Sequence, residues 1–138
     1  MVLQQLHSYF DNSSVRTERM KAVCKELDIA YKKLVRHSFT RWLSHDAVVR
    51  CVKDQLPALC RLFTHEESKH DSSAQGLLKC VSEYYFIASI MLFTEILPKF
   101  ARLSRIFQTA SLDFSIVDEE VQTLTEYLMS LLKVLFIS

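Results

Sequence analysis

The chain has 138 residues, of which 49% are hydrophobic and 24% are charged, and its net charge is +1. This balance is typical of one globular domain and excludes a disordered segment or a strongly charged tail. Gly76 is the only glycine. Because glycine supplies the tight turns of sheets and the loops that cradle phosphates, the sequence predicts an all-α fold and excludes Gly-rich nucleotide-binding motifs.

The first 40 residues predict two short helices and one undecided segment. A first helix is expected over Val2–Phe10, followed by a break at 11–14 in which Ser14 is the N-cap. A second helix is expected over Val15–Leu27. From Asp28 to Thr40 the apolar pattern weakens, and both a short extended piece and a frayed helix remain open.

A third helix is predicted to begin at Ser44, which is a favourable N-cap residue. Pro57 lies within it and predicts a kink, because proline removes a backbone hydrogen bond. The polar stretch 65–73 predicts a surface loop. One face of this helix carries apolar residues at helical spacing, namely Val48, Val52, Leu56, Leu59 and Phe63.

A fourth helix is expected from about Ala74, and it is apolar on most sides between Tyr84 and Leu97. A helix of this kind belongs at the centre of a bundle. Pro98 is expected to bend or break it. Beyond Pro98, Phe100, Leu103 and Phe107 are expected to face inward. Between them, Lys99, Arg102 and Arg105 are expected to form a basic ridge.

A fifth helix is predicted with Ser115 as its cap and acidic residues in its first turn. Its apolar positions form what we call the seam, which suits packing on another helix of the same chain or of a partner. Residues 131–137 end without a capping signal, so we expect truncation at this end. The seam comprises Val117, Val121, Leu124, Leu128, Leu131 and Leu135. The sequence thus predicts an all-α bundle of about five helices around a central apolar helix.

Targeting, metal and catalytic signals are weak. The sequence has no signal-peptide pattern, and the apolar run 84–97 is too short for a membrane span. The four cysteines contain no Cys-x-x-Cys pair and are expected to be reduced thiols. The tightest cluster of residue types that bind zinc is better explained as a surface loop beside a buried thiol than as a zinc site. It consists of Cys60, His65, Glu66 and His70. We expect no enzyme activity, no cofactor and no metal.

Charge is distributed unevenly along the chain. Residues 1–61 hold 11 Lys/Arg and 6 Asp/Glu, a net charge of +5, whereas residues 62–138 hold 6 and 10, a net charge of −4. Such asymmetry is found both in proteins that face nucleic acid and in bundles whose two halves attract each other. Charge alone favours the second interpretation.

Two stretches resemble proteins derived from hAT-family DNA transposases, nearest to the zinc finger protein 862-like group of that family. They are HSFTRWLSHDAVVRCVKDQLPAL at 37–59 and YYFIASIMLFTEILPKFARLSRIFQ at 84–108. The resemblance covers about Tyr9 to Leu131, and the Thr-Arg-Trp-Leu-Ser-His run at 40–45 is among its most specific parts.

The resemblance implies a ribonuclease-H-like catalytic domain, with two Asp and one Glu that hold divalent metal, interrupted by a helical insertion. Arg41 and Trp42 match a motif near the start of that insertion, where the Trp stabilises a flipped base. Nothing here matches the family's catalytic acids, its upstream Cys-x-x-His-like stretch, its zinc finger or its C-terminal dimerisation region. We therefore assign 1–138 to one helical domain, with lead-in helices over 1–40 and the start of the insertion over 41–138.

These observations predict a non-catalytic helical segment of a domesticated hAT-like protein that acts as a protein-interaction or structural module. The resemblance implies a nuclear location, and the alternative is the cytoplasm. Its expected contact is a protein partner or a second copy, bound through the seam. The alternative is a nucleic-acid-binding remnant that uses Arg41, Trp42 and the basic N-terminal half. Trp42 itself has two interpretations, as a core residue or as a DNA contact.

Overall fold

The structure is a computed structural model that describes residues 1–36, 42–67 and 69–137. These residues form six helices and no strand, which confirms the all-α fold. The helices are α1 (Val2–Asp11), α2 (Ser14–Glu26), α3 (Trp42–Glu67), α4 (Ser72–Val81), α5 (Tyr84–Phe107) and α6 (Phe114–Ile137).

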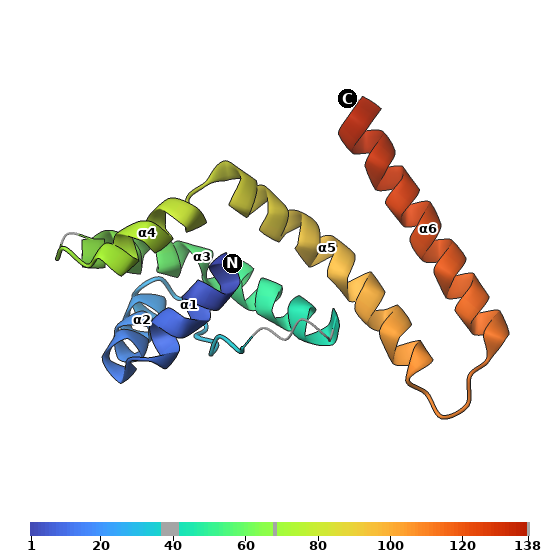
Figure 1. Ribbon diagram of the computed structural model, residues 1–138, viewed down its shortest axis with the longest axis horizontal. Coiled ribbons are helices and arrows are strands. Elements are labelled where there is room, and N and C mark those ends of the chain that lie inside the picture. Colours follow the sequence, from blue (N-terminus) through green and yellow to red (C-terminus); the bar gives the residue numbers. More distant parts are fainter. Residues whose placement is uncertain (37–41, 68, 138) are drawn as a thin grey trace.

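The helix at the centre of the packing is α3, which contacts α2, α4 and α5. Its buried residues recur along one side from Val48 to Glu66, and the side chains of Leu59 and Phe63 are fully buried. From α1, Tyr9 packs edge-on against Phe63, with ring centroids 5.3 Å apart. The apolar face predicted for this helix therefore forms the core of a bundle made by α1, α2, α3 and α4 (Figure 1).

Residues 29–36, left open by the sequence, are neither helix nor strand and cross the surface of α3. The Gln55 side chain, 1% exposed, accepts a hydrogen bond from the backbone N–H of Lys32 at 3.1 Å and donates one to its carbonyl at 2.8 Å. Before this segment, Asp28 ends α2 in the left-handed conformation, with φ 54°. A buried amide thus replaces the strand or helix partner that the segment lacks.

Several predicted boundaries shift. The N-cap of α2 is Ser13 instead of Ser14, and its hydroxyl accepts the N–H of Arg16 at 3.4 Å. At α6, the Asp113 carboxylate accepts the N–H of Ser115, so Asp113 takes the capping role predicted for Ser115. Helix α3 begins at Trp42, before Ser44, and continues to Glu67. The predicted loop 65–73 is shorter because Glu66 is buried and pairs with Arg19 of α2 at 2.8 Å.

The long apolar helix predicted from Ala74 is two helices. The chain bends by 62° between α4 and α5, at Ser82 and Glu83, whereas α5 continues through Pro98. Of the two effects predicted for Pro98, a bend or a break, the break does not occur. Helix α3 likewise continues through Pro57. The additional break raises the number of helices from the predicted five to six among the described residues.

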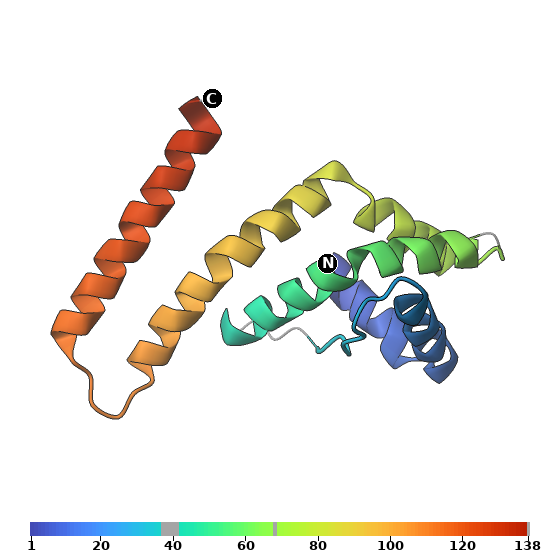
Figure 2. The ribbon, with the colours of Figure 1, turned by 180° about the vertical axis from the view of Figure 1, so that it is seen from behind.

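Helices α5 and α6 form an antiparallel pair in which α5 packs along α3 and α6 projects away from the bundle (Figure 1, and from behind in Figure 2). One side of α5 lies along α3, while α6 packs mainly against α5 and carries the C-terminus at its free end. Only Ile90, Leu97 and Ala101 of α5 are buried. The central position predicted for this apolar helix belongs instead to α3, because the second side of α5 is covered only in part.

Within the described ranges, no single helix is both long and apolar enough to cross a membrane. Helices α4 and α5 meet that condition only when the bent pair is taken together.

Candidate interaction surface

Exposed apolar side chains are concentrated on the α5–α6 pair, which we call the hairpin (residues 84–137). Of 17 exposed large hydrophobic residues in the described chain, 14 lie between Tyr84 and Phe136. Phe114 and Phe136 are each 80% exposed. Helices α5 and α6 are also the most apolar of the six, so the most hydrophobic helices are the least covered. In a monomeric protein the most hydrophobic helices are usually the most buried.

One row of phenylalanines runs the length of α5. Phe86, Phe93, Phe100 and Phe107 lie seven residues apart, which keeps them on one side of a helix. The side chain of Phe86 packs on the core of the bundle, but Phe93 is 46% exposed and Phe107 is 51% exposed. The row therefore begins at the bundle and continues onto the uncovered part of the hairpin.

The predicted seam of α6 faces α5 within the same chain. Val117, Leu124, Leu128 and Leu131 are half-buried, whereas Val121 is 40% exposed and Leu135 is 58% exposed. A second row, which we call the α6 stripe, overlaps the seam at Val121, Leu128 and Leu135 and is mostly open to solvent. It consists of Phe114, Val121, Leu128, Leu132 and Leu135. None of the described side chains of α6 is buried.

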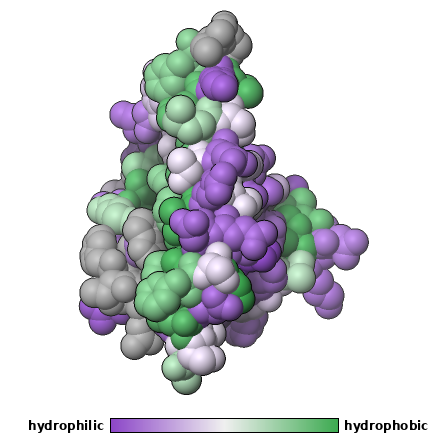
Figure 3. Space-filling view, turned by 90° about the vertical axis from the view of Figure 1, so that its right-hand side faces the viewer, coloured by the Kyte–Doolittle hydropathy of each residue, from purple (hydrophilic) through white to green (hydrophobic). Residues whose placement is uncertain are grey.

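The hydropathy of this side of the molecule is uneven (Figure 3). Hydrophobic atoms lie at the upper end of the view, where α6 ends, and again low on the same face, with hydrophilic atoms between them. At the upper end, Leu132, Leu135 and Phe136 lie around Lys133 on the last turns of α6. The apolar surface in this view is therefore divided into two patches by hydrophilic atoms.

Polar contacts hold α6 to the basic ridge of α5. Arg102 forms an ion pair with Glu120, and the ammonium of Lys99 lies 4.0 Å from the centre of the Tyr127 ring. The Tyr127 hydroxyl donates to Glu95 at 3.4 Å. Exposed contacts of this kind stabilise a geometry by about 1 kcal/mol or less each. The hairpin is therefore held by partial apolar packing and a few surface pairs.

The two residues of the transposase-like motif lie where the described residues resume, at the start of α3. Arg41 is outside the described residues. Trp42 begins α3, and its side chain is likewise outside them. The contact predicted for this pair therefore stays a prediction, as does the alternative that Trp42 is a core residue.

The basic N-terminal half is largely neutralised by internal ion pairs. Six of its cations pair with carboxylates: Arg16 with Asp71, Arg19 with Glu66, Lys21 with Glu18, Lys32 with Asp54, Arg50 with Asp46 and Arg61 with Glu26. Two of these pairs cross to acidic residues of the C-terminal half. In the described part of the chain, Lys25, Lys33, Arg36 and Lys53 form no ion pair.

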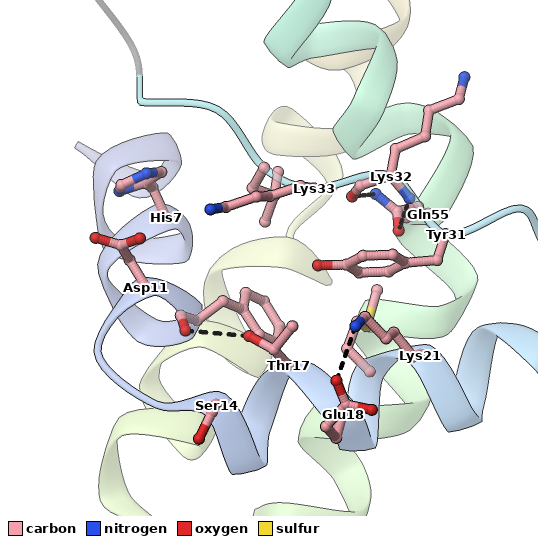
Figure 4. Close-up of a pocket in the computed structure, with 13 residues that line it drawn as sticks. His7, Asp11, Ser14, Thr17, Glu18, Lys21, Tyr31, Lys32, Lys33 and Gln55 are labelled. Carbon is pink, nitrogen blue, oxygen red and sulfur yellow. Dashed lines mark hydrogen bonds and ion pairs between the residues drawn. The ribbon is translucent and has the colours of Figure 1, made fainter.

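A pocket of about 370 Å³ lies between α1, α2 and the segment 29–36. In Figure 4 the Tyr31 ring extends across it, and Lys33 points toward His7 on α1. Burial raises the pKa of Tyr31, so its hydroxyl stays protonated. The rim of the pocket carries charges of both signs, and its cation Lys21 is already paired with Glu18. The pocket therefore does not concentrate charge of one sign.

The cluster of Cys60, His65, Glu66 and His70 does not form a ligand set, since the described residues contain no group of three His, Cys, Asp or Glu that could hold a metal ion. Glu66 turns toward Arg19. The four cysteines are free thiols, and burial raises the pKa of Cys24, Cys51 and Cys60. Raised thiol pKa values disfavour the reactive thiolate.

The fold and its exposed surface define a small helical bundle that carries a projecting, apolar helical hairpin. Comparisons of the chain with family models, with curated proteins and with solved structures found no match. Sequence reasoning identified the seam, and with it part of the α6 stripe, but missed Phe114, Leu132 and the exposure of α5. The seven-residue spacing of the phenylalanines was visible in the sequence and could have indicated a second apolar face.

Proposed function

We propose that this chain is a non-catalytic helical interaction module, with the α5–α6 hairpin as its docking surface. The observation that carries the proposal is the concentration of 14 of the 17 exposed large hydrophobic residues on this hairpin. Exposed apolar side chains concentrated on one part of a protein typically mark a protein-binding face, because their exposure to water is unfavourable.

The resemblance to hAT-family transposases supports an origin for the module as a nuclear, transposase-derived protein. Arg41, Trp42 and the run from Tyr84 to Gln108 carry that resemblance. The origin has its own test, which is the genomic sequence that flanks the coding region. Codons for the family's catalytic acids on either side support the origin, and their absence from intact flanking sequence contradicts it.

The docking surface is tested with paired substitutions of exposed residues. The double variant V121E/L132E changes two residues of the α6 stripe, and V15E changes a somewhat more exposed apolar residue of α2 as a control. We expect each variant to keep its helical circular dichroism and to change the free energy of unfolding by less than about 1 kcal/mol, since the sites are exposed.

Binding of a hydrophobic fluorescent dye then separates the two variants. At a concentration dilute enough for the chain to be monomeric, the stripe variant is expected to bind less dye than the unsubstituted chain, whereas V15E keeps that binding. Loss of helix in the stripe variant would show instead that Val121 and Leu132 are needed for the fold, and the proposal would then be wrong.

A second candidate function is nucleic-acid binding through the N-terminal half. It is favoured by Lys33 and Arg36, which are exposed, form no ion pair among the described residues, and lie on the segment that precedes Arg41 and Trp42. The six internal ion pairs weigh against it, because phosphate contacts require free cations.

This candidate predicts binding to single-stranded DNA that weakens steeply with salt. It further predicts that W42A abolishes the binding while the helical circular dichroism remains. Unfolding of W42A would favour the core interpretation of Trp42, and the absence of binding at low salt would exclude the candidate.

A further inference from the structure

We infer that the partner of the hairpin is a second copy of this chain, bound antiparallel through the α6 stripe to form a four-helix bundle. This inference rests on the proposed function, since it concerns the same surface. It goes beyond the proposed function because it specifies the binding partner, the relative direction of the paired helices and the residues at their interface.

The first argument is the uncovered area. An aromatic side chain offers about 150–250 Å² of surface, so the exposed fractions of four hairpin phenylalanines amount to about 500 Å². The exposed aliphatic residues of α6 add to this. This exposed area belongs to the hairpin as a whole, with Phe114 as the phenylalanine of the α6 stripe, and it approaches the roughly 800 Å² per partner of a stable complex. The four phenylalanines are Phe93, Phe107, Phe114 and Phe136.

The second argument is the position of the uncovered residues. Val121 is an exposed member of the seam and Leu132 lies beside it, next to the seam residues that face α5, so a helix packed there would also lie close to α5. A single helix pair leaves such a side open, whereas two pairs close it as a four-helix bundle. A second hairpin supplies a surface of the same length and the same apolar character.

The third argument is charge. The first turns of α6 carry Asp118, Glu119 and Glu120, and its last turns carry Lys133 alone. Asp118 and Lys133 are exposed and form no ion pair within the described part of the chain. Both lie on the same flank of the α6 stripe, at opposite ends.

Antiparallel pairing of two copies of α6 brings the acidic end of each helix beside the basic end of the other. The stripe runs from Phe114 to Leu135, so full overlap centres the two-fold axis near Thr125. Lys133 of each copy then lies beside Asp118 of the other, and the symmetry forms the pair twice. Parallel pairing would instead place acidic turns against acidic turns, which is unfavourable.

Sedimentation velocity of the full chain over a range of concentrations tests the inference. The unsubstituted chain and the control V15E are expected to dimerise, and V121E/L132E is expected to weaken the dimer at least 100-fold. The inference is overturned if V15E weakens the dimer equally or if the unsubstituted chain stays monomeric at several hundred micromolar.

Charge exchange tests the direction of pairing without altering the apolar surface. K133D is expected to weaken the dimer several-fold at low salt, and the double variant D118K/K133D is expected to restore it. The two residues are about 22 Å apart along one helix, so restoration requires contact between copies. Failure to restore overturns the antiparallel arrangement.

These outcomes separate the two proposals. A monomeric chain whose hairpin stays folded and still binds hydrophobic dye overturns self-association but leaves the interaction module in place with a different protein as its partner. A stripe variant that loses its helices overturns both proposals, because the stripe would then belong to the core of the monomer.

Discussion

The bundle α1–α4 and the hairpin α5–α6 use similar apolar residues with opposite results. In the bundle, α3 is amphipathic and contacts other helices on several sides, so that Leu59 and Phe63 are fully buried. In the hairpin, α6 is more apolar but packs mainly against one neighbour, and none of its described side chains is buried. Burial therefore follows from the number of neighbouring helices instead of from hydrophobicity.

The largest expected difference is between truncations at the centre of each region. F63A removes a fully buried ring and is expected to reduce the free energy of unfolding by about 3–5 kcal/mol. M129A, on the exposed side of α6, is expected to change it by less than about 0.5 kcal/mol in the monomer. Urea denaturation at a dilute concentration measures both. Equal losses would mean that the hairpin is packed as tightly as the bundle.

The bundle also contains the contacts that titrate in acid. Asp71 accepts hydrogen bonds from the Tyr9 hydroxyl at 3.2 Å and from Arg16 at 3.3 Å, and it caps α4 through the N–H groups of Ser73 and Ala74. Although burial acts to raise its pKa, the two backbone N–H groups, Arg16 and Tyr9 together lower the pKa of Asp71 below 3.8. Burial and the Asp71 charge raise the pKa of Tyr9 to about 12.

A lowered pKa in the folded state gives stability that is present above the unfolded pKa and is lost as pH falls through the folded value. The unsubstituted chain is therefore expected to lose stability below about pH 4, the ordinary range of an aspartate. D71N can still cap α4 but cannot form the ion pair, so we expect a loss of about 0.5–1 kcal/mol at pH 7 and a shallower decline in acid. Thermal melts from pH 2.5 to pH 7 would show the two curves converging; parallel curves would contradict the assignment.

A small effect of opposite sign is expected at the end of α2. The φ of Asp28 is 54°, a conformation that glycine adopts without strain. D28G is expected to raise the free energy of unfolding by about 0.5–1 kcal/mol, offset in part by the greater freedom of the unfolded chain. A Tm lower than that of the unsubstituted chain would mean that the Asp28 side chain stabilises the fold.

The sequence by itself determined the fold class and most helices. One glycine in 138 residues left little room for the turns of a sheet, and apolar spacing located the buried face of α3 because that spacing is a local property. Local signals also placed the starts of α2 and α6 within two residues, although adjacent serine or aspartate side chains took the capping role.

Only the tertiary structure decided which apolar surface is covered. Periodicity shows that a helix such as α5 has an apolar side, but it does not say whether another helix lies against it. The burial of Glu66 depends on Arg19, 47 residues away in the sequence, and the course of residues 29–36 depends on Gln55. Such contacts join positions that no local pattern relates, so the exposed hairpin that carries the proposed function could not be identified from the sequence alone.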